Sequence, residues 1–276
     1  MLFKSVTGLK HSFDMHLNKI DDALFKELAN YKGSPFYNVL VYAVDAGKRI
    51  RPLILLLSAE SVGQKGEDPL PSAVAIELLH IESLIHDDII DHEKARRGLS
   101  PVHIRFGYVP AILSADFILA AILNIVSRYR DSCIAQEFAS TVRKMCDGEL
   151  TEHKSADREK MAFDEYLNII ENKTASLFSA SARIGAIVGE GKETEIETLS
   201  NFGRLLGVSY QIKDDITDIN SDVATFNLRK IYDWTDLDTP KKIIIKYSQD
   251  AIKSLNPLKD SKAKTQLIDL AKSALI

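Results

Sequence analysis

The chain has 276 residues, of which 45% are apolar, so it is long enough to bury a large core. Its 35 basic and 39 acidic residues leave a net charge of −4, which provides no global positive field for nucleic acid or an anionic membrane surface. Two cysteines, Cys133 and Cys146, are too few for a disulfide framework or a cysteine-rich zinc site, which favours a reducing, cytoplasmic compartment. We therefore predict no nucleic-acid partner, and any anionic ligand needs a local cluster of basic residues.

No segment of the sequence favours secretion or a membrane span. Residues 1–17 lack a long apolar core followed by a small-residue cleavage site, which a secretory signal requires. The apolar stretch from Ala111 to Val126 is interrupted by Ser114, Asp116 and Asn124, and it falls short of about 18 uninterrupted apolar residues. We predict a soluble protein.

Helical periodicity dominates the sequence. Apolar residues recur three and four positions apart, as they do along residues 74–89 at Val74, Leu78, Ile81, Ile85 and Ile89. Alternating strand patterns are almost absent, and none is bounded by an Asn-Gly or Asp-Gly turn. Breakers divide the chain into helices joined by short loops, at residues 33–35, 63–71, 98–101, 107–110, 189–191 and 256–257. These features predict an all-α helical bundle that forms one domain over residues 1–276.

Two identical acidic motifs of the form Asp-Asp-x-x-Asp lie 127 residues apart. On a helix, positions i, i+1 and i+4 place their side chains toward one side, so each motif gathers three carboxylates. Mg²⁺ takes oxygen ligands, keeps several waters and is often completed by substrate phosphates. A solvated acidic face is the simpler explanation for one motif, but two copies that each follow an apolar helix favour a metal site. The predicted metal ligands are Asp87, Asp88, Asp91, Asp214, Asp215 and Asp218.

Basic residues bracket the first acidic motif. Lys48 and Arg51 lie upstream in the segment Gly47–Pro52, and Arg96 and Arg97 follow downstream. Arginine offers a bidentate fork to phosphate oxygens and lysine a compact charge, so these residues are predicted to bind phosphate together. His80 precedes Asp87 by seven residues, which places it on roughly the same helix face, where it could reach a second phosphate. A core or solvent-exposed histidine is the alternative.

These motifs, in this order, resemble those of the polyprenyl (isoprenyl) diphosphate synthase family. The resemblance runs from about residue 46 to Asp218 and rests on GKRIRP at 47–52, ELLHIESLIHDDIID at 77–91, RRG at 96–98, NKTASLF at 172–178 and FGRLLGVSYQIKDDITD at 202–218. It implies a helical bundle around a deep central cavity, usually a homodimer, in which the two acidic motifs face each other across the cavity mouth.

The resemblance also implies substrates and residue roles. The enzyme would be a trans-prenyltransferase that condenses isopentenyl diphosphate with an allylic diphosphate, with up to three Mg²⁺ ions at the six aspartates. Arg96, Lys173 and Gln211 would contact the allylic diphosphate, and isopentenyl diphosphate would be held by Lys48, Arg51, His80 and Arg97. Ionisation, condensation and proton loss would follow one another, with the released pyrophosphate as the base and with Lys173, Thr174 and Gln211 as the catalytic residues beside it.

Two features depart from the family pattern. Residues 219–242 contain no glycine, whereas the family usually carries Gly-Lys pairs there that bind diphosphate. Arg229 or Lys230 could take that role, or both could be surface charges. Glu82 and Ser83 occupy the positions that often set product length, and neither is an aromatic plug. We expect geranylgeranyl diphosphate or a somewhat longer product, and we expect the charge of Glu82 to turn aside or meet a partner.

Three other classes of protein remain open. A class I terpene cyclase would share magnesium chemistry, but it normally replaces the second aspartate motif and needs no isopentenyl site. A non-catalytic or partner-dependent subunit of a heteromeric synthase would keep the fold while losing acidic motifs. A purely structural bundle would need neither the acidic nor the basic clusters. Both aspartate motifs and the basic residues around them are present, which favours the catalytic prenyltransferase.

Overall fold

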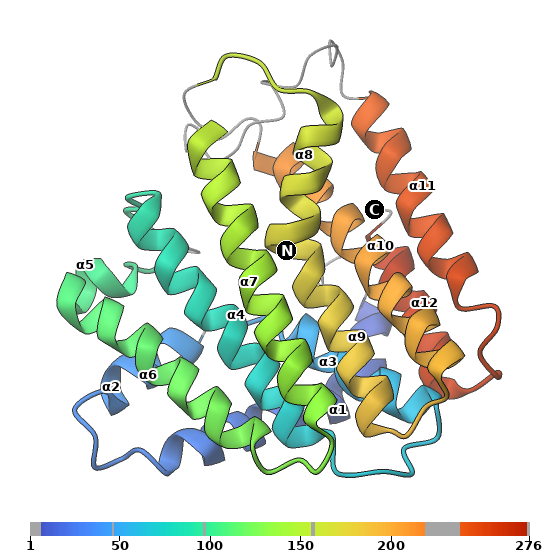
Figure 1. The fold of residues 1–276 in the computed structure, drawn as a ribbon, viewed down its shortest axis with the longest axis horizontal. Helices are drawn as coiled ribbons and strands as arrows, with labels where there is room; N and C mark the ends of the chain where they lie inside the picture. Colours follow the sequence, from blue (N-terminus) through green and yellow to red (C-terminus); the bar gives the residue numbers. More distant parts are fainter. Residues whose placement is uncertain (1–6, 46, 96–97, 156–157, 219–237, 275–276) are drawn as a thin grey trace.

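The computed structural model describes residues 7–45, 47–95, 98–155, 158–218 and 238–274. Within these ranges the chain is helical and forms no strand, so the all-α prediction is confirmed (Figure 1). The elements are α1 (Thr7–Ala29), α2 (Tyr37–Val44), α3 (Ile50–Ser61), α4 (Leu70–Ile90), α5 (Val102–Phe106), α6 (Tyr108–Val126), α7 (Ser132–Ser155), α8 (Phe163–Ile170), the π-helix η1 (Glu171–Ala175), α9 (Ser176–Val188), α10 (Glu193–Asp218), α11 (Asp238–Ser254) and α12 (Lys262–Ser273).

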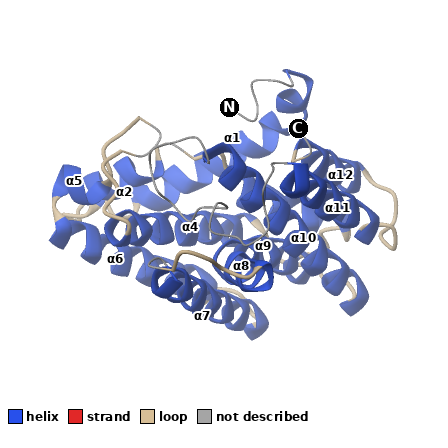
Figure 2. Ribbon diagram, turned by 90° about the horizontal axis from the view of Figure 1, so that it is seen from above, coloured by secondary structure: helices blue, strands red, loops and turns tan. Residues whose placement is uncertain are grey.

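The helices pack side by side into an elongated bundle. Helix α10 packs against α9 and α11, α3 packs against α9, and α4 packs against α6. Seen from above, α5 and α6 lie at one end of the bundle, α11 and α12 lie at the other, and α4, α9 and α10 lie between them (Figure 2). The apolar stripe predicted over residues 74–89 falls within α4, and its residues Val74, Leu78, Ile81 and Ile85 are buried.

Each predicted breaker lies at a boundary between two helices, but several other breaks were not predicted, among them those between α2 and α3 and between α7 and α8. Helix α6 ends at Val126 and α7 begins at Ser132, although the intervening residues 127–131 contain neither glycine nor proline. The π-helix η1 widens the helical path between α8 and α9 without any break in the apolar pattern. π-Helical turns are frequent at functional sites, and η1 contains Lys173 and Thr174.

Glycines let the helices around η1 approach closely. A Cβ atom on Gly148 of α7 would lie 2.5 Å from the backbone nitrogen of Lys173, so α7 can pack this closely only without a side chain there. On the opposite side, a Cβ atom on Gly207 of α10 would lie 2.7 Å from the Cα atom of Ala175. The π-helix is thus held between α7 and α10.

Arg49 is part of the fold rather than of an open basic cluster. Its buried guanidinium donates to Glu77 Oε1 and to Asp21 Oδ1 at 2.8 Å each, and to the Val44 carbonyl at 2.6 Å. A side chain on Gly47 would collide with this guanidinium. The glycine and arginine of the segment Gly47–Pro52 therefore fix the entry to α3, while Lys48 on the same segment is exposed.

Among the described helices, α6 has the length and composition that could cross a membrane, with a mean hydropathy of 2.1 in its most apolar window. In the folded chain, 44% of that window is buried inside the protein. Helix α6 therefore serves as a core helix on one side, through buried residues such as Ala111, Ala115, Ile118 and Ile122.

Candidate active site

The two acidic motifs occupy the carboxyl ends of two long helices. Asp87 and Asp88 lie in the last turn of α4, Asp91 is its C-cap, and Asp214 and Asp215 lie within the last five residues of α10. The carboxyl end of a helix carries partial negative charge, so carboxylates there are unfavourable unless a cation compensates them. Neither last turn contains a basic residue. The backbone and the side chains together therefore favour cation binding at both ends.

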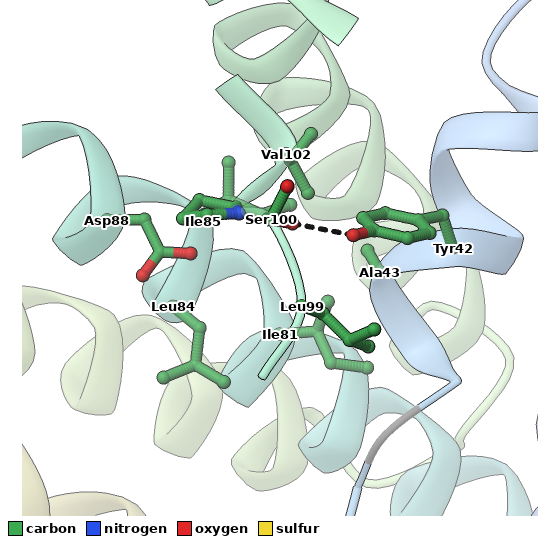
Figure 3. A pocket seen from close by; sticks show the side chains of 10 residues that line it. Tyr42, Ala43, Ile81, Leu84, Ile85, Asp88, Leu99, Ser100 and Val102 are labelled. Atoms are coloured by element: carbon green, nitrogen blue, oxygen red, sulfur yellow. Dashed lines mark hydrogen bonds between the residues drawn. The ribbon is translucent and has the colours of Figure 1, made fainter. Parts of the chain in front are cut away.

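The three acids of the first motif differ in exposure. Asp91 is exposed, Asp87 is half-buried, and Asp88 is buried with a relative exposure of 5%. The Asp88 side chain lines a pocket of about 80 Å³ between α4, α2 and residues 99–102, together with apolar side chains such as Ile81 and Leu84 (Figure 3). Tyr42 closes the far side of this pocket by donating a hydrogen bond of 2.6 Å to the Ser100 carbonyl.

The second motif takes part in a row of hydrogen bonds that runs from Tyr166 through Asp215 and Gln211 to Thr174. Tyr166 of α8 donates its hydroxyl to Asp215 Oδ2 at 2.6 Å, and Gln211 Nε2 donates to Asp215 Oδ1 at 2.7 Å. Thr174 Oγ1 donates to Gln211 Oε1 at 2.8 Å. Burial raises the pKa of Asp215 to about 7, although the hydrogen bonds from Tyr166 and Gln211 act in the opposite direction. Thr174 and Gln211, which the family resemblance places together at the site, are thus direct neighbours, whereas the side chain of Asp218 lies outside the described part of the chain.

Lys173 sits between two glutamates of α7. Its Nζ atom lies 2.7 Å from Glu149 Oε2 and also pairs with Glu152. Burial alone would lower the pKa of Lys173, but the carboxylates of Glu152, Asp87 and Glu149 raise it above the ordinary value. The pKa of Glu152 is also raised, because its burial outweighs the stabilisation that Lys173 provides. The neighbouring carboxylates therefore favour the charged form of Lys173.

Electrostatic neighbours show that the separate elements converge. Asp87 at the end of α4 acts on Lys173, Asp91 acts on Glu152, and Glu152 acts on Asp215 at the end of α10. The ends of α4 and α10, the middle of α7 and the π-helix η1 therefore face one region. Sequence reasoning missed Glu149, Glu152 and Tyr166. A signal for the glutamates was present, because they follow Gly148 and lie on one face of α7, three residues apart.

Some of the predicted phosphate-binding residues lie in the described part of the chain, and the others lie outside it. Arg51 lies in the first turn of α3, and its guanidinium carbon stacks 4.6 Å from the centre of the Phe178 ring. Lys48 lies near the second motif, because its charge acts on Lys213, the residue before that motif. Burial lowers the pKa of Lys213, Asp214 raises it, and the charge of Lys48 lowers it. His80 is half-buried on α4. Arg96, Arg97, Arg229 and Lys230 lie outside the described residues.

The positions expected to influence product length are occupied by a paired acid and a hydroxyl. Glu82 accepts from His86 Nδ1 at 3.0 Å, and this hydrogen bond raises the pKa of His86 although burial opposes it. Ser83 donates to the His80 carbonyl at 2.9 Å. The expectation that the charge of Glu82 would meet a partner is confirmed, and His86, one residue before the first acid, is that partner.

The donor set fits Mg²⁺ that is completed by phosphate. In the described part of the chain, no three acidic, histidine or cysteine groups come close enough to form a metal cage by themselves. The acids at the two helix ends offer only oxygen atoms, and Mg²⁺ usually takes one or two carboxylates together with waters and phosphate oxygens. Of the described acids in the two motifs, Asp87 and Asp214 are half-buried and Asp91 is exposed, so all three are accessible to such a ligand.

The sequence of this chain matches a protein-family model and several curated proteins. Residues 34–265 match the model for polyprenyl synthetase. A geranylgeranyl diphosphate synthase from Methanosarcina mazei is 36% identical over 208 residues, which cover 73% of this chain and 64% of that protein. A geranylgeranyl diphosphate synthase from Sulfolobus acidocaldarius is 32% identical over 230 residues, or 81% of this chain and 67% of that protein. The match thus spans just under two thirds of the first relative's length.

The fold matches solved structures over nearly its whole length. The crystal structure of a geranylgeranyl pyrophosphate synthetase from Pyrococcus horikoshii superposes with a TM-score of 0.86 at 27% identity, and the alignment covers 99% of each chain. Helical architecture, the paired acidic helix ends and the matched family model all agree with the resemblance carried by the five sequence motifs. This chain belongs to the polyprenyl synthetase family.

Proposed function

We propose that this protein is a trans-prenyltransferase that joins isopentenyl diphosphate to an allylic diphosphate and releases pyrophosphate. The observation that carries the proposal is the convergence of Lys173 with the acidic ends of α4 and α10. Acids alone would repel a diphosphate, so the site suits a ligand that arrives with divalent cations. Such a ligand also gives Lys173 an anionic partner other than Glu149 and Glu152.

Bound Mg²⁺, in up to three ions, would neutralise the diphosphate and stabilise the charge that develops as it leaves. Asp87, Asp91 and Asp214 would hold these ions, with Asp88 and Asp218 as the remaining candidates from the sequence. Lys173 would donate hydrogen bonds to the diphosphate oxygens. Because its charge is fixed and its position is set by α7, no reorganisation is needed when charge develops on the leaving group.

Carbon–carbon bond formation then needs orientation rather than a protein nucleophile. The double bond of isopentenyl diphosphate attacks the allylic cation, and a proton leaves to restore an alkene. Released pyrophosphate would accept this proton beside Thr174 and Gln211, which are hydrogen-bonded to each other. Lys48, Arg51, His80 and Arg97 would hold the isopentenyl diphosphate, and Arg96 the allylic diphosphate. Arg51 contributes a guanidinium plane fixed against Phe178.

Geranylgeranyl diphosphate, or a somewhat longer chain, is the proposed product. Two relatives with this product in their names support the proposal. Glu82 and Ser83 also present no aromatic ring at the positions that would block a growing chain. The two free and exposed cysteines suit a reducing compartment, so we place the enzyme in the cytoplasm.

A homodimer is the proposed assembly, formed through the outer face of α6. An apolar stripe at helical spacing remains exposed there, interrupted by Asp116, with relative exposures of 67% for Val109, 46% for Ile112, 46% for Leu113 and 61% for Leu123. A second copy would bury this stripe by an isologous contact. Light scattering coupled to size exclusion should give twice the chain mass, and Val109→Glu with Leu123→Glu should give a monomer.

Product analysis tests the proposed reaction. Purified protein is incubated with Mg²⁺, labelled isopentenyl diphosphate and, separately, dimethylallyl, geranyl or farnesyl diphosphate, and the dephosphorylated products are separated by chromatography. We expect chains that end mainly at 20 carbons and that vanish with chelator or in Asp87→Ala. Asp22→Ala is the matched control, because it removes an acid of α1 that belongs to neither motif.

The outcomes separate the remaining classes. A folded protein that elongates no primer would contradict the proposal and point to a subunit that needs a partner. A cyclic hydrocarbon made from one allylic diphosphate without isopentenyl diphosphate would point to a terpene cyclase.

A further inference from the structure

We infer that Asp215 is a positioning residue rather than a magnesium ligand, and that Tyr166 and Asp215 together fix the direction of the hydrogen bonds through Gln211 to Thr174. The inference rests on the proposed prenyl transfer and revises the metal role predicted for Asp215 from sequence. Tyr166 is new to the site, because no sequence motif pointed to it.

Both oxygens of Asp215 already have protein donors. Oδ2 accepts from the Tyr166 hydroxyl at 2.6 Å and Oδ1 accepts from Gln211 Nε2 at 2.7 Å. Tyr166 is fully buried in a small apolar cluster with Ile169, Ile170 and Ile212, so its hydroxyl cannot turn to water. Moving Asp215 onto a metal would leave a buried hydroxyl and an amide without their acceptor, which is costly.

A carboxylate at position 215 determines the polarity of the whole row. In its ionised form the carboxylate only accepts hydrogen bonds, and the NH₂ group of Gln211 faces it, as the 2.7 Å contact has it. The Gln211 carbonyl oxygen therefore faces Thr174, and Thr174 must donate its hydroxyl proton to it, as the 2.8 Å contact has it. The lone pairs of Thr174 Oγ1 are then left for a partner outside the row.

This polarity gives Thr174 a defined role in the proposed reaction. An oxygen that presents lone pairs stabilises positive charge on the growing chain, whereas an outward-facing hydroxyl proton would repel that charge. The departing proton itself goes to the released pyrophosphate. Thr174 adjoins Lys173, which lies beside the acids of both helices. The row thus connects the buried Tyr166, which packs against Ile212 of α10, to Thr174 beside Lys173.

The test compares Asp215→Asn and Tyr166→Phe with Asp214→Asn as the matched control from the same motif. An asparagine at 215 keeps the shape but can donate or accept, so the row loses its fixed polarity. We expect kcat to fall about tenfold or more in Asp215→Asn. It should fall less in Tyr166→Phe, because that variant loses only one hydrogen bond to a buried charge. The KM values for the two diphosphates should change little. Asp214→Asn should lower kcat further and, unlike the other two variants, should also raise the Mg²⁺ concentration needed for half-maximal activity.

Metal binding is measured in the absence of prenyl substrates. Mn²⁺ is titrated into each variant in the presence of inorganic pyrophosphate, and electron paramagnetic resonance reports how much Mn²⁺ is bound. Mn²⁺ replaces Mg²⁺ at oxygen ligands. We expect Asp215→Asn and Tyr166→Phe to bind Mn²⁺ as wild type does, and Asp214→Asn to lose at least one ion. Equal loss of Mn²⁺ in Asp215→Asn and Asp214→Asn would overturn the inference.

A double-mutant cycle tests the link to Thr174. In a Thr174→Val background, Asp215→Asn should cost little further activity, because the group that it positions is gone. Fully additive losses would overturn the inference. Thermal unfolding of each variant identifies a misfolded protein. A wild type that binds Mn²⁺ and pyrophosphate but makes no prenyl product would count against the proposed function alone.

Discussion

The carboxyl end of α4 and the carboxyl end of α10 carry the same five-residue pattern but treat its second acid differently. At the end of α4, Asp88 is buried beside a mostly apolar pocket that it shares with α2 and residues 99–102. At the end of α10, Asp215 is held by Tyr166 from α8 and by Gln211 from one turn earlier in α10. A shared motif therefore fixes the spacing of three carboxylates, but the neighbouring helices decide what each one does.

The largest effect should come from the first acid of each motif. We expect Asp87→Asn and Asp214→Asn each to lower kcat about 100-fold or more, because each removes a negative charge that holds Mg²⁺ against the leaving diphosphate. Steady-state kinetics at saturating Mg²⁺ measures this. If either variant kept near-normal turnover, the two helix ends would not act as a pair.

Lys173 links the two helix ends, and Gly148 sets its position. A Cβ atom on Gly148 would meet the Lys173 backbone at 2.5 Å, so Gly148→Ala must displace the π-helix or α7. We expect this variant to lose about 1–3 kcal/mol of unfolding free energy, as overpacking does, and to lower kcat as well. Urea unfolding gives the first quantity.

Gly33→Ala is the control for this experiment, because a Cβ atom on Gly33 would meet nothing within 4 Å. Equal stability of the two alanine variants would contradict the close packing of α7 on η1.

Arg51 tests the side of the site that faces α9. Its guanidinium stacks on Phe178, which itself packs against Tyr210 of α10 at 5.5 Å between ring centres. Lysine keeps the charge but loses both the stacking plane and the bidentate fork, so Arg51→Lys should raise the KM for isopentenyl diphosphate about tenfold. The KM for the allylic primer should change less. Equal increases in both would mean that Arg51 does not distinguish the two diphosphates.

A further prediction concerns the pH dependence of stability in the metal-free protein. Because burial raises the pKa of Asp215 to about 7, the folded state binds more protons than the unfolded state between about pH 4 and pH 7. The contribution of Asp215 to stability is therefore largest at low pH and is lost as the pH rises through 7. From pH 5 to pH 8, wild type should lose up to about 3 kcal/mol relative to Asp215→Asn, at about 1.4 kcal/mol per pH unit. Parallel stability curves would contradict the raised pKa.

Much of this account could be predicted from the sequence, because helices and motifs leave local patterns. The stripe through Val74, Leu78 and Ile81 predicted α4, and the residue types of the two aspartate motifs pointed to the site. Lys173, Thr174 and Gln211 were expected there from the family resemblance. The contact between Thr174 and Gln211 joins residues 37 positions apart, and only packing of η1 against α10 brings it about.

What the sequence could not predict depends on contacts between distant helices. Tyr166 reads as an ordinary core aromatic until α8 packs against α10 and places its hydroxyl on Asp215. Glu149 and Glu152 read as one face of an exposed helix until Gly148 brings α7 onto η1 and Lys173 meets both. The π-helix also lacks a composition signal of its own, since ENKTA suits an ordinary helix turn equally well.

The most direct test is a crystal structure of the protein with Mg²⁺ and an unreactive allylic diphosphate analogue. The account predicts Mg²⁺ within about 2.0–2.1 Å of carboxylate oxygens of Asp87 and Asp214, with Lys173 on the diphosphate and Asp215 still accepting from Tyr166 and Gln211. A structure in which Asp215 leaves Tyr166 and coordinates Mg²⁺ directly, or in which the diphosphate binds away from these two helix ends, would contradict it.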